Sequence, residues 1–268
     1  GSTIAFAPHG SGNVTIVNDD GINFAASTVG GNLTTDDTNA LTDGETITGG
    51  TSGATGVVVL GANGSSSVTY TGTMRHITGG YIFLAGETIT GGTSGNTRVI
   101  ASSGVANGTL TATATTGNIT QSGALTITGA SSFTTVEAEA DIDLATNGTS
   151  NNFYEGVSFT TAGSRGDVTV YDSNDFYLGT STINGNLEVE TANVTAANIG
   201  DDGSVTVTGT ADLSASGTSN ASVASIWMKN SSHIFGGGLS AQGHHVHFKL
   251  GADTVLGTIR AKKGKVEI

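Results

Sequence analysis

The sequence predicts an all-β chain: a parallel β-solenoid with an inserted antiparallel β lobe. Three observations lead to this prediction. Val, Ile, Leu and Phe alternate with Thr through most of the chain, which is the period of a half-buried strand. Short strands of this kind recur at a regular interval along the chain, and a longer block of sequence occurs twice.

The composition supports strands and argues against disorder. The chain has 268 residues, 42 Gly, one Pro and no Cys, and only 12% of its residues are charged. A chain rich in Gly, Thr, Ser and Asn could be disordered, but the regular apolar alternation argues against this. The scarcity of Pro fits a hydrogen-bonded ladder, and the absence of Cys excludes disulfides and thiolate metal sites. No apolar run is long enough to span a bilayer, so we expect no membrane-spanning helix.

The charge distribution excludes one class of partner. The net charge of −13 argues against nucleic-acid binding, which needs a basic surface. The segment 229–268 nevertheless contains six basic and two acidic side chains, a net charge of +4. The segment 1–228 therefore carries −13 − 4 = −17. One end of the chain is basic and the remainder is acidic.

The longer repeat joins two distant segments. Val14–Leu33 (VTIVNDDGINFAASTVGGNL) aligns without a gap with Val168–Leu187 (VTVYDSNDFYLGTSTINGNL). Apolar positions and the Gly-Asn turn residues both match. We interpret the two segments as one structural unit that is used twice.

Short strands continue between and beyond these copies. After Val168 their first apolar residues are Leu187, Val205, Ile226, Val246 and Val266, which are nearly evenly spaced. A strand of about five residues and its turn fill about a third of a coil of about 20 residues. The spacing therefore predicts stacked coils in which like residues lie above like.

A second repeat lies between the first copies. The segment LTDGETITGGTSGATGVV at residues 41–58 recurs from residue 84 as LAGETITGGTSGNTRV. Its Gly-Gly-Thr-Ser-Gly between two β-branched runs predicts a hairpin turn. We therefore expect residues 1–34 to form the first coils and 35–108 an inserted hairpin lobe. Residues 109–228 would form the main solenoid, and 229–268 the basic terminal coils.

Three stretches share one style of repeat: Ala26–Thr34 (ASTVGGNLT), Gly117–Thr126 (GNITQSGALT), and Asp141–Leu144 (DIDL) followed by Asn151-Asn152-Phe153. They resemble the filamentous-haemagglutinin type of repeat of large secreted bacterial surface proteins. The resemblance implies a right-handed parallel β-helix, export from the cell, and a role in adhesion or matrix building. The inserted GETITGGTSG motif is similar to short repeats of tailed-phage virion proteins, which leaves a virion role open.

Catalytic residues are not indicated. Gly200-Asp201-Asp202, Gly243-His244-His245 and Ile259–Lys262 loosely resemble elements of polygalacturonases in the same chain order. The upstream Asn-Thr-Asp element of that family is missing, and hydrolysis needs carboxylates held across one cleft. We interpret Asp201-Asp202-Gly203 as a turn and expect a non-enzymatic protein without a cofactor.

Two sets of residues are candidates for metal binding. His245 and His247 share one face of a predicted strand and could bind a metal together with His233 or His9. Calcium prefers oxygen ligands in turns. The candidate calcium ligands are Asp19, Asp20, Asp36, Asp37, Asp172, Asp175, Asp201 and Asp202. Solvated turns and an exposed polar strand face are the alternatives.

The basic terminal coils are the candidate assembly interface. Lys265–Ile268 still alternate as a strand, although an open solenoid exposes its ladder edges. We expect head-to-tail contacts between copies that form fibres, with the basic end facing an acidic surface. The interface would use Lys249, Arg260, Lys262, Lys263, Lys265, Val266 and Ile268. The alternative is an adhesin segment, in which the 35–108 lobe or the end near Trp227 and Phe235 binds a glycan or host surface.

Overall fold

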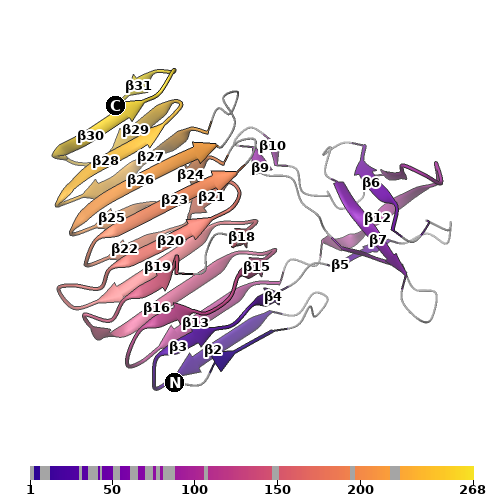
Figure 1. Cartoon of the computed structure of the whole chain (residues 1–268), viewed down its shortest axis with the longest axis horizontal. Coiled ribbons are helices and arrows are strands. Elements are labelled where there is room, and N and C mark those ends of the chain that lie inside the picture. The colour runs from indigo at the N-terminus through magenta and orange to yellow at the C-terminus, as the bar shows by residue number, and fades with distance from the viewer. Residues whose placement is uncertain are drawn as a thin grey trace.

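The computed structural model is all-β, and most of its strands pair in parallel (Figure 1). It describes residues 3–6, 13–29, 32–35, 42, 44–50, 55–60, 66–69, 75–76, 79–80, 88–105, 108–146, 151–193, 197–217 and 224–268. Every element in these ranges is a strand, which confirms the predicted all-β class. No helix long and apolar enough to cross a membrane occurs among them.

Three parallel sheets form a stack. Sheet A contains, in order, β1 (Thr3–Ile4), β3 (Ile22–Phe24), β14 (Ile119–Gln121), β17 (Ile142–Leu144), β20 (Val168–Asp172), β23 (Leu187–Asn193), β26 (Thr210–Gly217), β28 (Gly238–Gly243) and β30 (Leu256–Ala261). Sheet C contains β4 (Ser27–Val29), β15 (Leu125–Ile127) and β18 (Asn152–Phe153).

Sheet B has eleven strands and makes the other long face. They are β2 (Val14–Asn18), β13 (Leu110–Ala114), β16 (Ser131–Ala138), β19 (Val157–Ala162), β21 (Phe176–Leu178), β22 (Ser181–Ile183), β24 (Ile199–Asp201), β25 (Val205–Val207), β27 (Ile226–Phe235), β29 (Val246–Leu250) and β31 (Val266–Glu267). The chain passes repeatedly between sheets A and B, and its two ends lie at opposite ends of the stack (Figure 1).

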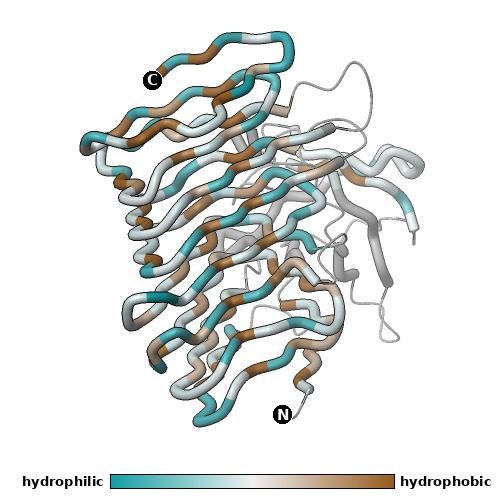
Figure 2. The backbone as a smooth tube through the Cα atoms, turned by 60° about the vertical axis from the view of Figure 1, so that its left-hand side comes forward, coloured by the Kyte–Doolittle hydropathy of each residue, from teal (hydrophilic) through white to brown (hydrophobic). Residues whose placement is uncertain are grey.

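The alternating sequence explains the core. In β13 the residues Leu110, Ala112 and Ala114 are buried and the two Thr between them are half-buried. The same period recurs in strand after strand, so brown and teal segments alternate along the coils in Figure 2. The inward residues of all three sheets form one continuous apolar cluster. Within it Phe133 and Phe159 stack with ring centroids 5.9 Å apart.

The cross-section of the stack changes along its length. The long strand β19 pairs with two short strands, with β21 through Val157↔Leu178 and with β22 through Thr160↔Thr182. Strand β27 likewise pairs with both β24 and β25. The hydrogen-bond connectivity of sheet B therefore closes a ring of parallel strands, whereas the even spacing in the sequence predicts a simple stack of like strands.

The longer repeat forms one local structural unit twice, as predicted, but the two copies lie at different positions around the stack. Its two copies do form matching local units: β2, β3 and β4 have the same lengths and spacing as β20, β21 and β22. However, β2 lies in sheet B, whereas β20 lies in sheet A. The same strand–turn–strand unit is thus placed on two different faces, because sequence similarity determines local turns but not the position of the unit around the stack.

The predicted coil-to-coil steps are partly wrong. Val168 pairs with Leu187, Ile226 with Val246, and Val246 with Val266, so these three steps follow the register. The predicted pairing of Leu187 with Val205 does not form, because Leu187 pairs with Ala211. Val205 pairs with Ser181 of an earlier coil, so its predicted place between Leu187 and Ile226 is wrong. The long strand of one coil and the two short strands of another carry the same apolar-x-apolar pattern. The pattern alone therefore does not tell which strand of the next coil each one pairs with.

Six other strands form a closed antiparallel barrel. They are β5 (Asn32–Thr35), β6 (Thr46–Gly49), β7 (Thr55–Leu60), β8 (Ser66–Thr69), β11 (Thr88–Gly91) and β12 (Thr97–Val105). A separate pair, β9 (Arg75–His76) and β10 (Gly79–Gly80), is also antiparallel. Because β5 belongs to the barrel, the barrel begins at Asn32, slightly before the predicted start of the insertion at residue 35.

The shorter repeat gives the barrel a local two-fold symmetry. Strands β6 and β11 are the two copies of Thr-Ile-Thr-Gly, and they pair antiparallel with Thr48 opposite Thr90. Strand β11 continues through the Gly-Gly-Thr-Ser turn into its antiparallel partner β12. Glu45 stabilises this turn by accepting hydrogen bonds from the backbone N–H of Ser94 at 2.9 Å and of Thr93 at 3.2 Å. The first repeat copy thus supports the turn of the second.

Candidate functional site

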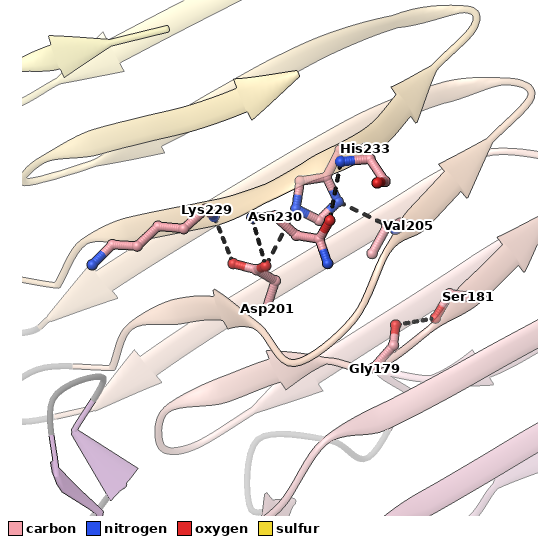
Figure 3. A network of polar contacts seen from close by, with 8 residues as sticks. Gly179, Ser181, Asp201, Val205, Lys229, Asn230 and His233 are labelled. Atoms are coloured by element: carbon pink, nitrogen blue, oxygen red, sulfur yellow. Dashed lines mark hydrogen bonds and ion pairs between the residues drawn. The ribbon is translucent and has the colours of Figure 1, made fainter. Parts of the chain in front are cut away.

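Two of the candidate residues, Asp201 and His233, form a largely buried polar pair (Figure 3). Asp201 ends β24, and His233 lies in β27, where the register shifts between Met228 and His233. The Asp201 carboxylate accepts the backbone N–H groups of Lys229 at 2.7 Å and Asn230 at 2.9 Å. It therefore holds the bulged part of β27 against the coil below.

The imidazole of His233 is enclosed by protein groups on both nitrogens. Nδ1 accepts the N–H of Val205 at 3.2 Å, and Nε2 faces the Asp201 carboxylate at 3.5 Å. Since Nδ1 is an acceptor, the proton of the neutral ring resides on Nε2 and points to Asp201. The pair thus links three strands, β24 with Asp201, β25 with Val205 and β27 with His233.

The charge on Asp201 is stabilised despite burial. Burial raises the pKa of this carboxyl, but the His233 imidazole and the N–H groups of Lys229 and Asn230 lower it more. The pKa of Asp201 therefore lies below its usual value. Asp202, the next residue, is exposed and its carboxylate lies against Gly156, so the two adjacent carboxylates do not converge on one site.

His245 and His247 do lie on one face of the β29 segment. The ring of Trp227, on β27, lies 5.8 Å from the His245 ring and 5.9 Å from the His247 ring. Lys229 Nζ lies 5.2 Å from the centroid of the indole. The result is an outward-facing aromatic and cationic cluster near the basic end of the stack.

The hydrogen bonds of this cluster compete with metal binding. His245 Nδ1 accepts the backbone N–H of Lys265 at 3.1 Å, which leaves the ring proton on Nε2. His247 Nδ1 lies 2.9 Å from the Glu267 carboxylate, and this hydrogen bond lowers the pKa of Glu267. A metal ion at His245 would first have to break its bond to Lys265 or remove the Nε2 proton.

The other metal candidates are dispersed. Asp19 and Asp20 follow β2, while His233 is enclosed with Asp201. His9, Asp36 and Asp37 lie outside the described residues. Within the part of the chain that the structure describes, no three His, Asp or Glu side chains are grouped to hold a metal ion.

Asp172 and Asp175, also calcium candidates, belong to a buried polar corner. Asp172 accepts the N–H groups of Asn174 at 2.7 Å and Phe153 at 2.9 Å, and Asp175 accepts that of Asn198 at 2.6 Å. Burial, with a smaller contribution from the neighbouring Asp175, raises the pKa of Asp172 to about 8 against the effect of its two hydrogen bonds. A protonated Asp172 is a poor ligand for calcium.

The same corner contains Asn151, which the sequence analysis notes only as part of the repeat resemblance and not as a buried hydrogen-bonding residue. Its fully buried amide donates to the carbonyls of Leu144 and Tyr171 and accepts the N–H of Leu125 at 2.8 Å. It also exchanges two hydrogen bonds with Gln121. No local pattern marks this role, because Asn151 looks like one more Asn of a polar loop.

Besides the buried corner, a row of more exposed hydrogen bonds connects the turns that lead into sheet A. In each step a side-chain oxygen accepts the backbone N–H of the equivalent residue in the next coil. The steps join Asn118 to Asp141, Asp141 to Asp167, Asp167 to Asn186, and Asn186 to Thr210. Asn and Asp at these turns are therefore connectors between coils.

The predicted assembly residues do gather on the last strands. Lys249, Arg260, Lys262, Lys263 and Lys265 are exposed on or beside β29, β30 and β31. Val266 and Ile268 are 46% and 56% exposed, although Val246 and Phe248 in the coil below are buried. Leu256 at the start of β30 is 45% exposed. These apolar side chains of the last strands are therefore more exposed than those one coil below.

An acidic groove lies on the outer face of sheet A. Its volume is about 390 Å³, and Glu188, Glu190, Asp212, Ser240 and Gln242 are among its lining residues. The three carboxylates come from neighbouring strands β23 and β26. Sequence reasoning did not select them, because outward Glu and Asp on a strand look like any solvated face.

The matches to known families fit the repeated architecture. Residues 85–160 and 165–242 match the model of a family described as repeats of unknown function (DUF5649). No curated protein and no solved structure matches the chain. Since the two matches cover more than half of its residues, the chain belongs to the DUF5649 family of repeats.

Proposed function

We propose that the chain is a right-handed parallel β-helix that serves as a secreted, non-enzymatic structural protein, in which copies stack head to tail into a fibre, surface layer or matrix. The observation that carries the proposal is the open end of the core. Leu256, Val266 and Ile268 are about half exposed, while the residues one coil below them are buried.

The N-terminal end of the stack also presents apolar side chains, which could pack against those of the C-terminal end. Ile4, Val14 and Ile16 are only partly buried, although they belong to the core of the first coils. Burying a Val or Ile side chain contributes about 1.5–3 kcal/mol. Contact between the two ends would cover these side chains and would also pair strand edges, which soluble proteins normally protect.

The remaining features support a structural role. His233 and His245 are engaged in hydrogen bonds to neighbouring coils, and the polar corners connect coil to coil. Secretion and the handedness of the helix are supported by the resemblance to the filamentous-haemagglutinin type of repeat. The basic segment 229–268 can attract the acidic remainder of another copy, which favours head-to-tail encounters.

The test is a charge placed in the open end. We expect Val266→Lys to weaken self-association of the purified chain by at least about tenfold, measured by sedimentation velocity over a concentration series. Val136→Lys is the matched control, because Val136 is 52% exposed on β16 in the middle of the stack. Equal association of the two variants, or no association of the unmodified chain, would refute the proposal.

A second candidate function is binding of a glycan or host surface, as an adhesin segment. The observations that favour it are the acidic groove on sheet A and the cluster of Trp227 with His245, His247 and Lys229. Saturable glycan binding by non-associating single chains, lost in Trp227→Ala, would favour this alternative over assembly.

A further inference from the structure

At both ends of the stack, successive strands of the chain alternate between sheet A and sheet B. At the C-terminal end the chain runs through β28 in sheet A, β29 in sheet B, β30 in sheet A and β31 in sheet B. At the N-terminal end it runs through β1 in sheet A, β2 in sheet B and β3 in sheet A. A second copy placed after β31 would therefore continue the alternation without a break.

The edges that would meet are open on both copies. Among the described strands, β30 pairs only with β28 and β31 only with β29. At the other end, β1 pairs only with β3, and β2 only with β13. Each of these four strands keeps one row of N–H and C=O groups that another parallel strand can bond.

The register of sheet A specifies how the edges fit. Ile4 lies opposite Phe24 on β3. The same inward column runs up the sheet through Leu144, Val170, Val189, Leu213 and Ala241 to Ile259 on β30. The column therefore begins at Ile4 and ends at Ile259, and both side chains are only partly buried.

We propose that the partner of the C-terminal face is the N-terminal face of a second copy, with β1 of that copy added to β30. In this junction Ile4 of the second copy lies opposite Ile259, and Thr3 lies opposite Thr258. In sheet B the corresponding column places Val14 of the second copy above Ile268. This junction rests on the self-assembly proposed above and gives it a register.

Direction and charge both favour this partner over a symmetric one. The strands of sheet A all pair in parallel, and only a head-to-tail copy continues a parallel ladder. Two C-terminal faces in contact would bring together two sets of Arg260, Lys262, Lys263 and Lys265. Residues 1–34 contain two Asp and no Lys or Arg. Contact with the N-terminal face therefore places no Lys or Arg against the basic side chains of the C-terminal face.

A disulfide can test this register because the chain has no Cys of its own. Thr3 and Thr258 are both exposed and point outward, away from the core. Neighbouring strands lie about 4.8 Å apart, which is within the Cα separation that a disulfide spans. We expect the double variant Thr3→Cys/Thr258→Cys to form a ladder of cross-linked multimers under mild oxidation, seen on a non-reducing gel.

The matched control is Thr169→Cys/Thr258→Cys. Thr169 lies in the same outward row of sheet A, but its strand β20 is paired on both sides by β17 and β23. We expect no ladder from this variant. Dominant cross-linking of Thr258→Cys chains to one another would overturn the head-to-tail junction in favour of a symmetric one.

The result separates the junction from assembly itself. If sedimentation shows association but Thr3 and Thr258 do not cross-link, the proposed register is wrong while self-assembly stands. If the unmodified chain does not associate at all, self-assembly and the junction both fail.

Discussion

At the residue scale, Asp201 connects two coils through the backbone of β27. Replacing it with Ala removes the acceptor of the Lys229 and Asn230 N–H groups and the partner of the His233 ring. We expect Asp201→Ala to lower the free energy of unfolding by about 1–2 kcal/mol, because the part-buried Asn230 N–H and the buried His233 ring lose their partner. Urea unfolding measures this.

The control for Asp201 is Asp253→Ala, at an exposed position near the end of the stack. It should change the free energy of unfolding by less than about 0.5 kcal/mol. Because the pKa of Asp201 is lowered, its contribution is present above the pKa of an unfolded Asp and is lost as the pH falls through the folded value. A similar loss in both variants would contradict the role assigned to Asp201.

Asp172 gives a pH dependence of the opposite sign. Its pKa is about 8 in the folded chain, whereas an unfolded Asp has a pKa of about 3.9. The folded state therefore keeps this proton while the unfolded state loses it, and stability falls as the pH rises from about 4 to about 8. Asp172→Asn cannot titrate and should remove this decline.

The measurement for Asp172 is the free energy of unfolding at several pH values in this range. The slope is the informative quantity, since the substitution also alters hydrogen bonds to Phe153 and Asn174 and can lower stability at every pH. Parallel curves for the variant and the unmodified chain would show that Asp172 does not carry the proton.

At the element scale, the buried polar corner at Asn151 should stabilise the fold more than the exposed row of turn residues that includes Asn186. Asn151 is fully buried and satisfies groups on neighbouring coils, so Asn151→Ala should cost about 3 kcal/mol or more. Asn186 is exposed and accepts from Thr210, where water can replace it, so Asn186→Ala should cost less than about 1 kcal/mol. Thermal unfolding of both variants compares them directly, and equal losses would contradict the distinction.

The elements also show how far the sequence alone leads. Apolar-x-apolar alternation predicts the existence and inward face of strands such as β13 and β20, because the period of a strand is local. It does not predict that β2 and β20 lie in different sheets, because this depends on how many residues each turn uses. The antiparallel pairing of β6 with β11 is likewise a long-range result of two similar hairpins.

The same limit applies to the candidate site. The shared face of His245 and His247 follows from their positions on either side of Val246 in one strand. The pairing of Asp201 with His233 does not follow from the sequence, since a whole coil and a register shift in β27 separate them. The buried corner at Asn151 and Asp172 joins segments that carry ordinary polar loop composition.

At the scale of the whole molecule, the stack is built from parallel strand pairs and the barrel from antiparallel ones. The stack buries one continuous apolar cluster, and among the described strands β1, β2, β30 and β31 are each paired on one side only. The barrel instead closes its six strands on themselves. We therefore expect growth by strand pairing at the ends of the stack and not at the barrel.

The most direct test of end-to-end stacking is cryo-electron microscopy of the purified chain at rising concentration. We expect filaments in which all subunits point the same way and the strand spacing of about 4.8 Å continues across each junction. Dispersed single stacks at every concentration, or filaments whose subunits alternate in direction, would contradict the account.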